Sequence, residues 1–125
     1  MIFGVGTDIV AVARMAQLLE RHGERGMEKL LAPSEYGECR ASSAPERFLA
    51  KRFAAKEALG KALGSGVRAP ALLPAIAVVH DDQGKPSFAF APALAAYIAE
   101  RGLTAHLSLS DERDYAVAFV VLEKT

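Results

Sequence analysis

Apolar residues in the first third of the chain are spaced in a way that predicts one short strand followed by helices. The apolar residues that precede Asp8 indicate a buried strand over Ile2–Thr7. From Ile9 to His22 the apolar positions recur at helical spacing, which predicts an amphipathic helix. Shorter helical turns are expected after it, over Glu28–Leu31 and from Pro33 toward Arg40.

The segment Glu46–Leu63 is the strongest predicted element of the sequence. It is rich in Ala, Leu, Lys, Arg and Glu, and Gly64 follows it where a C-terminal cap belongs. Its apolar residues are spread around the helix instead of forming one stripe, so other elements must cover it on more than one side. We therefore expect a central helix.

The second half of the chain is predicted to form antiparallel strands and one more helix. Ala75–His80 and Pro86–Phe90 flank a turn-rich connection, which is typical of a β-hairpin. Pro92–Arg101 has a helical pattern, Thr104–Ser110 alternates as a strand, and Tyr115–Leu122 is an almost continuous apolar strand. Together these elements predict one α+β domain over residues 1–125, with antiparallel β-hairpins packed on the long central helix.

The composition excludes two classes of protein and leaves a third open. Hydrophobic residues make up 51% of the 125 residues, and 15 Lys and Arg balance 15 Asp and Glu, which argues against a disordered chain and against a general nucleic-acid binder. The balance hides a local excess. The window from Arg40 to Arg68 holds seven basic residues against Glu46 and Glu57, a net charge of +5. That excess has the right sign for one compact anionic ligand.

The single cysteine and the short apolar runs predict the compartment. Cys39 is the only cysteine, so no intrachain disulfide can form, which suits a reducing compartment. The longest apolar runs contain prolines and are shorter than the roughly 18 residues that crossing a bilayer requires. No positive cluster leads the chain as in a signal peptide. We expect a soluble cytoplasmic protein with no membrane partner.

Asp8 is the first candidate for chemistry. It follows Gly4-Val5-Gly6-Thr7, but Ile9 holds the position where a dinucleotide-binding fingerprint needs its third glycine, so that motif is excluded. Asp8 is then either the cap of the helix that begins after it or a functional acid at the end of a strand.

Glu57 is the second candidate, because it lies on the central helix among small and apolar residues, where an unpaired carboxylate is costly. One interpretation is a structural pair with Lys61, four residues on. The other is that Glu57 and Asp8 together hold Mg²⁺, with Lys61 facing an anionic substrate, since two carboxylates suffice for Mg²⁺ when substrate phosphates and water complete its ligands. The residues alone leave both interpretations open.

The glycine-rich segment Gly64-Ser65-Gly66 also has two interpretations. It is either a glycine cap of the central helix or a backbone nest for a phosphate. A helix C-terminus repels anions, so the second interpretation requires Lys61, Arg52 or a metal nearby.

A polar stripe of His106, Ser108 and Ser110 follows one face of a predicted strand. Alternate residues on a strand lie roughly 6.5–7 Å apart, which is too far for a hydrogen-bonded catalytic triad. The stripe lines a binding cleft or a subunit interface, or it faces solvent.

Three segments, in this order and spacing, resemble the holo-acyl-carrier-protein synthases, the short bacterial kind of 4′-phosphopantetheinyl transferase. The matching residues are Gly4-Val5-Gly6-Thr7-Asp8-Ile9-Val10 with Arg14, then Arg47-Phe48-Leu49-Ala50-Lys51-Arg52-Phe53-Ala54-Ala55-Lys56-Glu57-Ala58 with Lys61 and Gly64-Ser65-Gly66, then Gly84-Lys85-Pro86, and last His106-Leu107-Ser108-Leu109-Ser110-Asp111-Glu112-Arg113 with Tyr115-Ala116. The resemblance runs essentially from end to end.

The resemblance implies a Mg²⁺-dependent transfer of phosphopantetheine from coenzyme A to a serine of apo acyl carrier protein, in support of fatty acid biosynthesis, with adenosine 3′,5′-bisphosphate as the other product. It implies catalytic roles for Asp8, Glu57 and Lys61, with Asp8 and Glu57 as the metal ligands. Coenzyme A would be bound by Arg52, Lys61, Gly64, Ser65, Gly66, His106 and Ser108, and the acidic carrier by Arg14 and Arg21.

The resemblance also implies a homotrimer with active sites shared between neighbouring subunits. Many members of the family have a histidine where this chain has Asp111, so the acceptor of the serine proton stays open between water, Glu57 and Asp111. Two other functions compete with the transferase: a non-catalytic nucleotide- or phosphate-binding module in which Asp8 and Lys61 form only an ion pair, and a Mg²⁺-dependent phosphohydrolase.

Overall fold

The computed structural model describes all 125 residues, Met1–Thr125, as an α+β structure. The elements in chain order are β1 (Ile2–Ala11), α1 (Val12–His22), α2 (Glu24–Leu30), η1 (Pro33–Glu35), α3 (Tyr36–Ala41), α4 (Pro45–Leu63), η2 (Leu73–Ala75), β2 (Ile76–His80), β3 (Pro86–Phe90), α5 (Pro92–Glu100), β4 (Leu103–Asp111) and β5 (Tyr115–Lys124). The predicted class, the long helix and the hairpin are confirmed. No helix has the length and apolarity that a bilayer-crossing segment needs.

The strands form two antiparallel groups. β1, β5 and β4 make a three-stranded sheet with β5 in the middle, and β2 pairs with β3 in a separate hairpin. Along β5 the residues alternate between a fully buried face and a more exposed one. The two faces of this sheet therefore have different environments.

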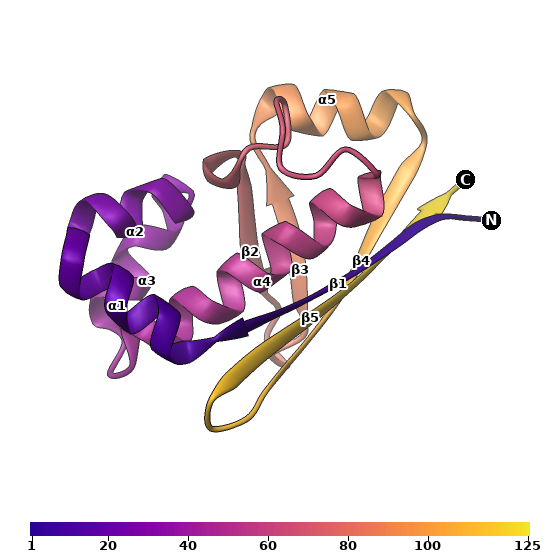
Figure 1. The fold of residues 1–125 in the computed structure, drawn as a ribbon. Helices are drawn as coiled ribbons and strands as arrows, with labels where there is room; N and C mark the ends of the chain where they lie inside the picture. The colour runs from indigo at the N-terminus through magenta and orange to yellow at the C-terminus, as the bar shows by residue number, and fades with distance from the viewer.

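Helix α4 packs on the inner face of the three-stranded sheet (Figure 1). Two glycines of β1 make the close approach possible. A Cβ atom at Gly6 would lie 2.0 Å from the carbonyl oxygen of Ala58, and one at Gly4 would lie 2.1 Å from that of Ala62. Helices α1–α3 gather around the N-terminal half of α4, and α5 lies near its other end (Figure 1).

The outer face of the same sheet has no helix or hairpin over it (Figure 1). It presents large apolar side chains to solvent, among them Val5, Ile9 and Phe119, which are 53%, 62% and 46% exposed. An apolar face of this kind is typical of an interaction surface.

The start of the first helix was predicted too early, because β1 continues to Ala11 and α1 begins only at Val12. The pairing with β5 extends as far as Ala11 opposite Tyr115, and the exposed Ile9 beside the buried Val10 follows a strand period. The interpretation of Asp8 as a helix cap is therefore wrong. Asp8 lies within the strand, and the cap position belongs to Ala11.

Candidate active site

Asp8 and Lys61 meet where β1 runs beneath the second half of α4. The strand alternation places Asp8 on the inner face, toward α4, while Thr7 and Ile9 face outward. Lys61 Nζ donates a hydrogen bond to Asp8 Oδ1 at 3.1 Å and another to the Thr7 carbonyl oxygen at 2.9 Å. The side chain of Asp8 is 18% exposed and that of Lys61 is 54% exposed, so the pair lies at the edge of the core and is open to a ligand.

Glu57 lies one helical turn before Lys61, and its carboxylate is repelled by the charge of Asp8. Burial, followed by repulsion from Asp8, raises the pKa of Glu57 above its ordinary value, while Lys61 and Arg14 act in the opposite direction. The ion pair of Lys61 is with Asp8 and not with Glu57. The structure thus brings together Asp8, Glu57 and Lys61.

The two carboxylates match the donors that Mg²⁺ uses when a phosphate substrate supplies the rest. Oxygen ligands are what this hard cation prefers, and one or two protein carboxylates suffice when substrate phosphates and water complete the set. No third histidine, cysteine or acid joins them, since no group of three or more such side chains occurs in the chain. Burial, followed by repulsion from Asp8, disfavours the charged form of Glu57, and a cation between the two acids would offset this repulsion.

The Gly64–Gly66 loop closes the C-terminal end of α4, one turn beyond Lys61. Gly64 has a left-handed φ of 86°, and its N–H donates to the Gly60 carbonyl, as does the N–H of Gly66. The glycine-cap interpretation is confirmed. These two N–H groups are occupied by the cap, whereas Ser65 is exposed beside them.

Arg52 does not reach the Asp8–Lys61 pair. Its guanidinium is buried, with Nε 3.0 Å from Glu35 Oε2, a distance suited to an ion pair but without hydrogen-bond alignment. Arg52 also lies over the ring of Phe48 at 4.2 Å. It lines a hollow of about 310 Å³ together with three other basic side chains, Arg47, Lys51 and His80. This hollow lies beside the first half of α4.

Asp111 belongs to the same region. It lies 3.1 Å from Arg47 and 3.7 Å from Lys51, so two cations balance its charge. The strand register places Asp111 two strands across and two residues along from Asp8, roughly 12 Å away. Arg47 also donates to the Glu112 and Arg113 carbonyl oxygens at 2.6 and 2.8 Å, which fixes the β4–β5 turn on α4.

His106 and Ser108 lie on the outer face of the sheet, opposite the face that carries Asp8. The predicted alternation of β4 is confirmed, with His106, Ser108 and Ser110 all exposed. His106 Nε2 lies 3.0 Å from Glu123 Oε1, and Ser108 is paired with Phe119 in the register. A single chain therefore does not bring His106 to Asp8.

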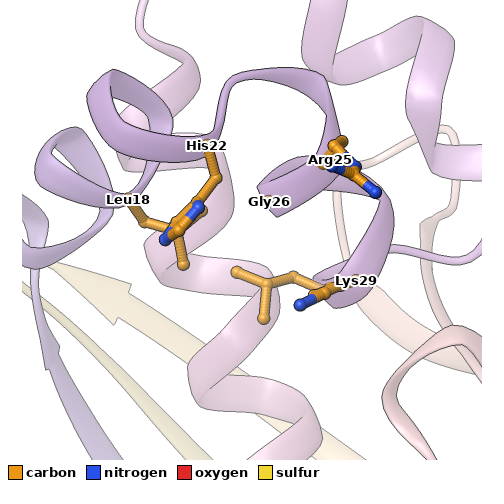
Figure 2. A pocket seen from close by; sticks show the side chains of 6 residues that line it. Leu18, His22, Arg25, Gly26 and Lys29 are labelled. Carbon is orange, nitrogen blue, oxygen red and sulfur yellow. The ribbon is translucent and has the colours of Figure 1, made fainter.

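Arg14 and Arg21 lie on α1 and share a shallow hollow of about 220 Å³. Arg14 stacks over Phe53 at 5.2 Å and is close enough to lower the pKa of Glu57. A larger pocket of about 410 Å³ lies alongside, between α1 and α2. Figure 2 shows Leu18 on one side of it and the nitrogen-bearing ends of His22, Arg25 and Lys29 around it.

The sequence prediction did not include Glu35 as a site residue and named Lys56 only as part of a motif. Both are buried, at 1% and 0% exposure. The signal for Lys56 was its position beside Glu57 within a run of small residues, where a lysine needs a buried partner. Nothing in the sequence around Glu35 marks it, because a short polar turn after a proline is ordinarily exposed.

Comparison with known proteins agrees with this geometry. Residues 4–120 match the family model of the 4′-phosphopantetheinyl transferase superfamily. The holo-[acyl-carrier-protein] synthase of Aromatoleum aromaticum is 59% identical over 124 residues, with 99% of each chain covered. The crystal structure of the synthase from Neisseria meningitidis superposes with a TM-score of 0.96 at 44% identity and covers 99% of this chain and 100% of that one.

A second solved structure shares the fold and carries a ligand. The holo-(acyl-carrier-protein) synthase of Bacillus anthracis, solved in complex with CoA (3′,5′-ADP), is 35% identical with a TM-score of 0.83, and the match covers 100% of this chain and 99% of that one. The family match, the full-length relatives and the common fold lead to one conclusion: the chain belongs to the 4′-phosphopantetheinyl transferase superfamily.

Proposed function

We propose that this protein is a holo-acyl-carrier-protein synthase, which transfers 4′-phosphopantetheine from coenzyme A to a serine of apo acyl carrier protein. The other product is adenosine 3′,5′-bisphosphate, and the modified carrier serves fatty acid biosynthesis. The observation that carries the proposal is the convergence of Asp8, Glu57 and Lys61 between β1 and α4 in a member of this family. Because the single Cys39 is an unpaired thiol, a reducing cytoplasm suits the protein.

Asp8 and Glu57 are the proposed ligands of Mg²⁺. The cation, when bound, offsets the charge of the coenzyme A diphosphate. The ammonium group of Lys61 would bind a diphosphate oxygen. Its hydrogen bond to Asp8 holds it at the same place. Most of the rate enhancement comes from positioning and charge stabilisation, as is general for phosphoryl transfer.

In the transfer, the carrier serine Oγ forms a bond to the phosphorus that bears the pantetheine arm. The bond from that phosphorus to the bridging oxygen breaks, and the electron pair leaves with adenosine 3′,5′-bisphosphate. The serine proton goes to water or to Glu57 Oε. Asp111 is the less suitable acid, since it is distant from Asp8 and paired with Arg47.

Coenzyme A is proposed to extend from this centre along the basic half of α4. The hollow beside it is lined by Arg47, Lys51 and Arg52 and also by Glu38, so phosphate groups bound there would replace part of the pairing that these cations make with Asp111 and Glu38. Ser65, exposed in the cap of α4 with Gly64 and Gly66, contributes at the diphosphate end. His106 and Ser108 would come from a neighbouring subunit, because their own chain turns them to the opposite face of the sheet.

A homotrimer is the proposed assembly. The exposed apolar outer face of the sheet gives each copy a surface to bury against another copy. That surface includes the polar stripe with His106 and Ser108, so covering it would bring this stripe to a neighbour. In such an assembly, His106 and Ser108 of one subunit would complete the active site that Asp8 and Glu57 of its neighbour begin.

The acidic carrier is proposed to dock on α1 and α2. Arg14 lies close enough to Glu57 to lower its pKa and shares a hollow with Arg21, and the pocket beside them adds Arg25 and Lys29 with Leu18 at one side (Figure 2). Such a surface complements an acidic helix that also offers an apolar side chain.

The decisive experiment is a mass spectrum of apo acyl carrier protein after incubation with coenzyme A, Mg²⁺ and this protein. A gain of one phosphopantetheine group on the carrier supports the transferase. Cleavage of coenzyme A without carrier modification would select the phosphohydrolase, and no chemistry would select the binding module. Asp8→Asn and Glu57→Gln are expected to abolish the gain, whereas Asp82→Asn, an exposed acid of the β2–β3 turn, serves as the unaffected control.

A further inference from the structure

The second half of α4 is held on the side opposite the sheet by a buried ion pair that takes no part in the proposed chemistry. Lys56 Nζ is 2.6 Å from Glu35 Oε1 and also donates to the carbonyl oxygens of Leu30 at 2.7 Å and Leu73 at 3.2 Å. Its three ammonium protons thus have three acceptors. These acceptors belong to η1, to the end of α2 and to η2, so one side chain joins α4 to three other elements.

Glu35 is equally well satisfied. Its Oε1 accepts from the Ala32 N–H at 2.9 Å as well as from Lys56, and its Oε2 accepts from the Val78 N–H at 3.0 Å with Arg52 Nε at 3.0 Å. Neither Glu35 nor Lys56 exposes more than 1% of its surface. A buried ion pair contributes little to stability compared with apolar residues of the same size, and its best-attested use is to specify one arrangement of packed elements.

The contact between α4 and the sheet specifies that arrangement only in part. Gly4 and Gly6 lie against backbone atoms of Ala58 and Ala62, and the directional bonds from α4 to the sheet come from the exposed side chains of Lys61 and Arg47. The small residues allow close approach but do not fix how far the helix is rotated about its axis. Lys56 projects roughly 120–160° around the helix from these alanines and about 100° from Glu57. Its buried directional bonds therefore restrain the rotation of α4 from the side away from the sheet, where the exposed bonds of Lys61 and Arg47 do not act.

We propose that Lys56 and Glu35 are positioning residues of the active site: their buried pair fixes the rotation of α4 that turns Glu57 and Lys61 toward Asp8. The proposal concerns the geometry of the same site. Its expected effect on the reaction rate rests on the proposed function. It places no substrate contact on either residue.

Lys56→Met tests the proposal. It keeps the apolar stem and removes the ammonium, while Glu35 retains the Ala32 and Val78 N–H groups and Arg52. A small displacement of catalytic groups costs about tenfold or more in rate, so we expect kcat to fall by about tenfold or more with little change in KM for either substrate. The crystal structure of the variant is expected to show Lys61 Nζ out of reach of Asp8.

Leu59→Ala is the matched control. Leu59 is fully buried on the same helix and makes no polar side-chain contact, so its truncation lowers the melting temperature without releasing the ion pair. It should retain kcat and the Lys61–Asp8 contact. An equal loss of kcat in Leu59→Ala would show that activity follows stability and would overturn the proposal. So would a Lys56→Met protein with wild-type kcat or an intact Lys61–Asp8 contact.

Two provisions keep the test decisive. If Lys56→Met does not fold, Glu35→Gln replaces it, because this change preserves the size of the side chain and one acceptor. We expect the same lowered kcat and a longer Lys61–Asp8 distance. An unchanged kcat and an unchanged distance would overturn the proposal. If the wild-type protein transfers nothing, the proposed function fails by itself. The Lys61–Asp8 distance in the variant structures then still decides whether the buried pair positions α4.

Discussion

Lys61 lies near both Asp8 and Glu57, but its ammonium group forms an ion pair with Asp8 and not with Glu57. Glu57 is therefore the acid that is left without a partner of its own. Burial and the nearby carboxylate of Asp8 destabilise its charged form and raise its pKa. A cation bound between the two acids would offset this repulsion.

Glu57→Gln is expected to stabilise the metal-free protein at neutral pH. Burial first, and repulsion from Asp8 second, raise the pKa of Glu57 above 4.5. The folded protein then holds this proton more tightly than the unfolded chain does, so the free energy of unfolding falls as the pH rises through the folded pKa. The uncharged amide avoids that loss, and we expect a higher melting temperature for Glu57→Gln than for the wild type at pH 7.

Calorimetry without divalent cations at several pH values measures this difference. The gap should close below pH 4.5, where the carboxyl is protonated in both the folded and the unfolded chain. A variant that melts below the wild type at pH 7 would show that Glu57 makes a net stabilising contact instead.

The sequence predicts individual site residues where the chemistry of a side chain and its position in a predicted element both point to the same site. Asp8, Glu57 and Lys61 were predicted as a group, and the structure brings them together. Glu35 could not be predicted, because its importance arises from Lys56 and Val78, which are distant in the sequence and meet it only in the folded chain.

Among the elements, β1 and α4 make the contact on which the site depends. The sequence predicts α4 almost to the residue, since helix formers and a glycine cap agree there. The predicted end of β1, at Thr7, was wrong because Ile9 and Val10 fit both a helical and a strand pattern. Only the hydrogen-bonded partner strand β5, more than a hundred residues away in the sequence, decides between the two patterns.

Gly6→Ala is expected to disrupt the contact between these two elements. The new Cβ would lie 2.0 Å from the Ala58 carbonyl oxygen, a backbone atom that cannot move aside without displacing α4. We expect a loss of about 3 kcal/mol or more in the free energy of unfolding, measured by urea denaturation, or failure to fold. Gly37→Ala, on α3 with no atom within 4 Å of the added Cβ, is the control and should be neutral or slightly stabilising.

Arg14→Glu tests the docking role of helix α1. Reversing this charge should raise the KM for the acyl carrier protein by about tenfold or more, because a like charge then faces an acidic partner, while the KM for coenzyme A changes much less. Arg101→Glu, just beyond α5 and stacked on Tyr97, is the matched charge reversal and should leave both KM values unchanged. Equal effects of Arg14→Glu on both substrates would remove α1 from the docking surface.

A single chain does not bring together all the residues that the resemblance assigns to the active site. The resemblance assigns His106 and Asp8 to one site, yet the sheet carries them on opposite faces. No pattern within a strand reveals this, because each residue has the exposure expected for its position. The exposed apolar side chains around His106, such as Phe119, supply the physical reason for a second copy to cover that face.

Hybrid assemblies distinguish a shared site from a site within one chain. Asp8→Asn and His106→Ala are each expected to be inactive or weak at limiting coenzyme A. When equal amounts of the two variants are refolded together, random assembly gives about a quarter of interfaces with an intact Asp8 on one subunit and an intact His106 on its neighbour. Activity should recover to about that fraction of the wild-type value, whereas mixing without refolding should recover none. No recovery in trimers shown by mass to contain both variants would mean that each chain completes its own site.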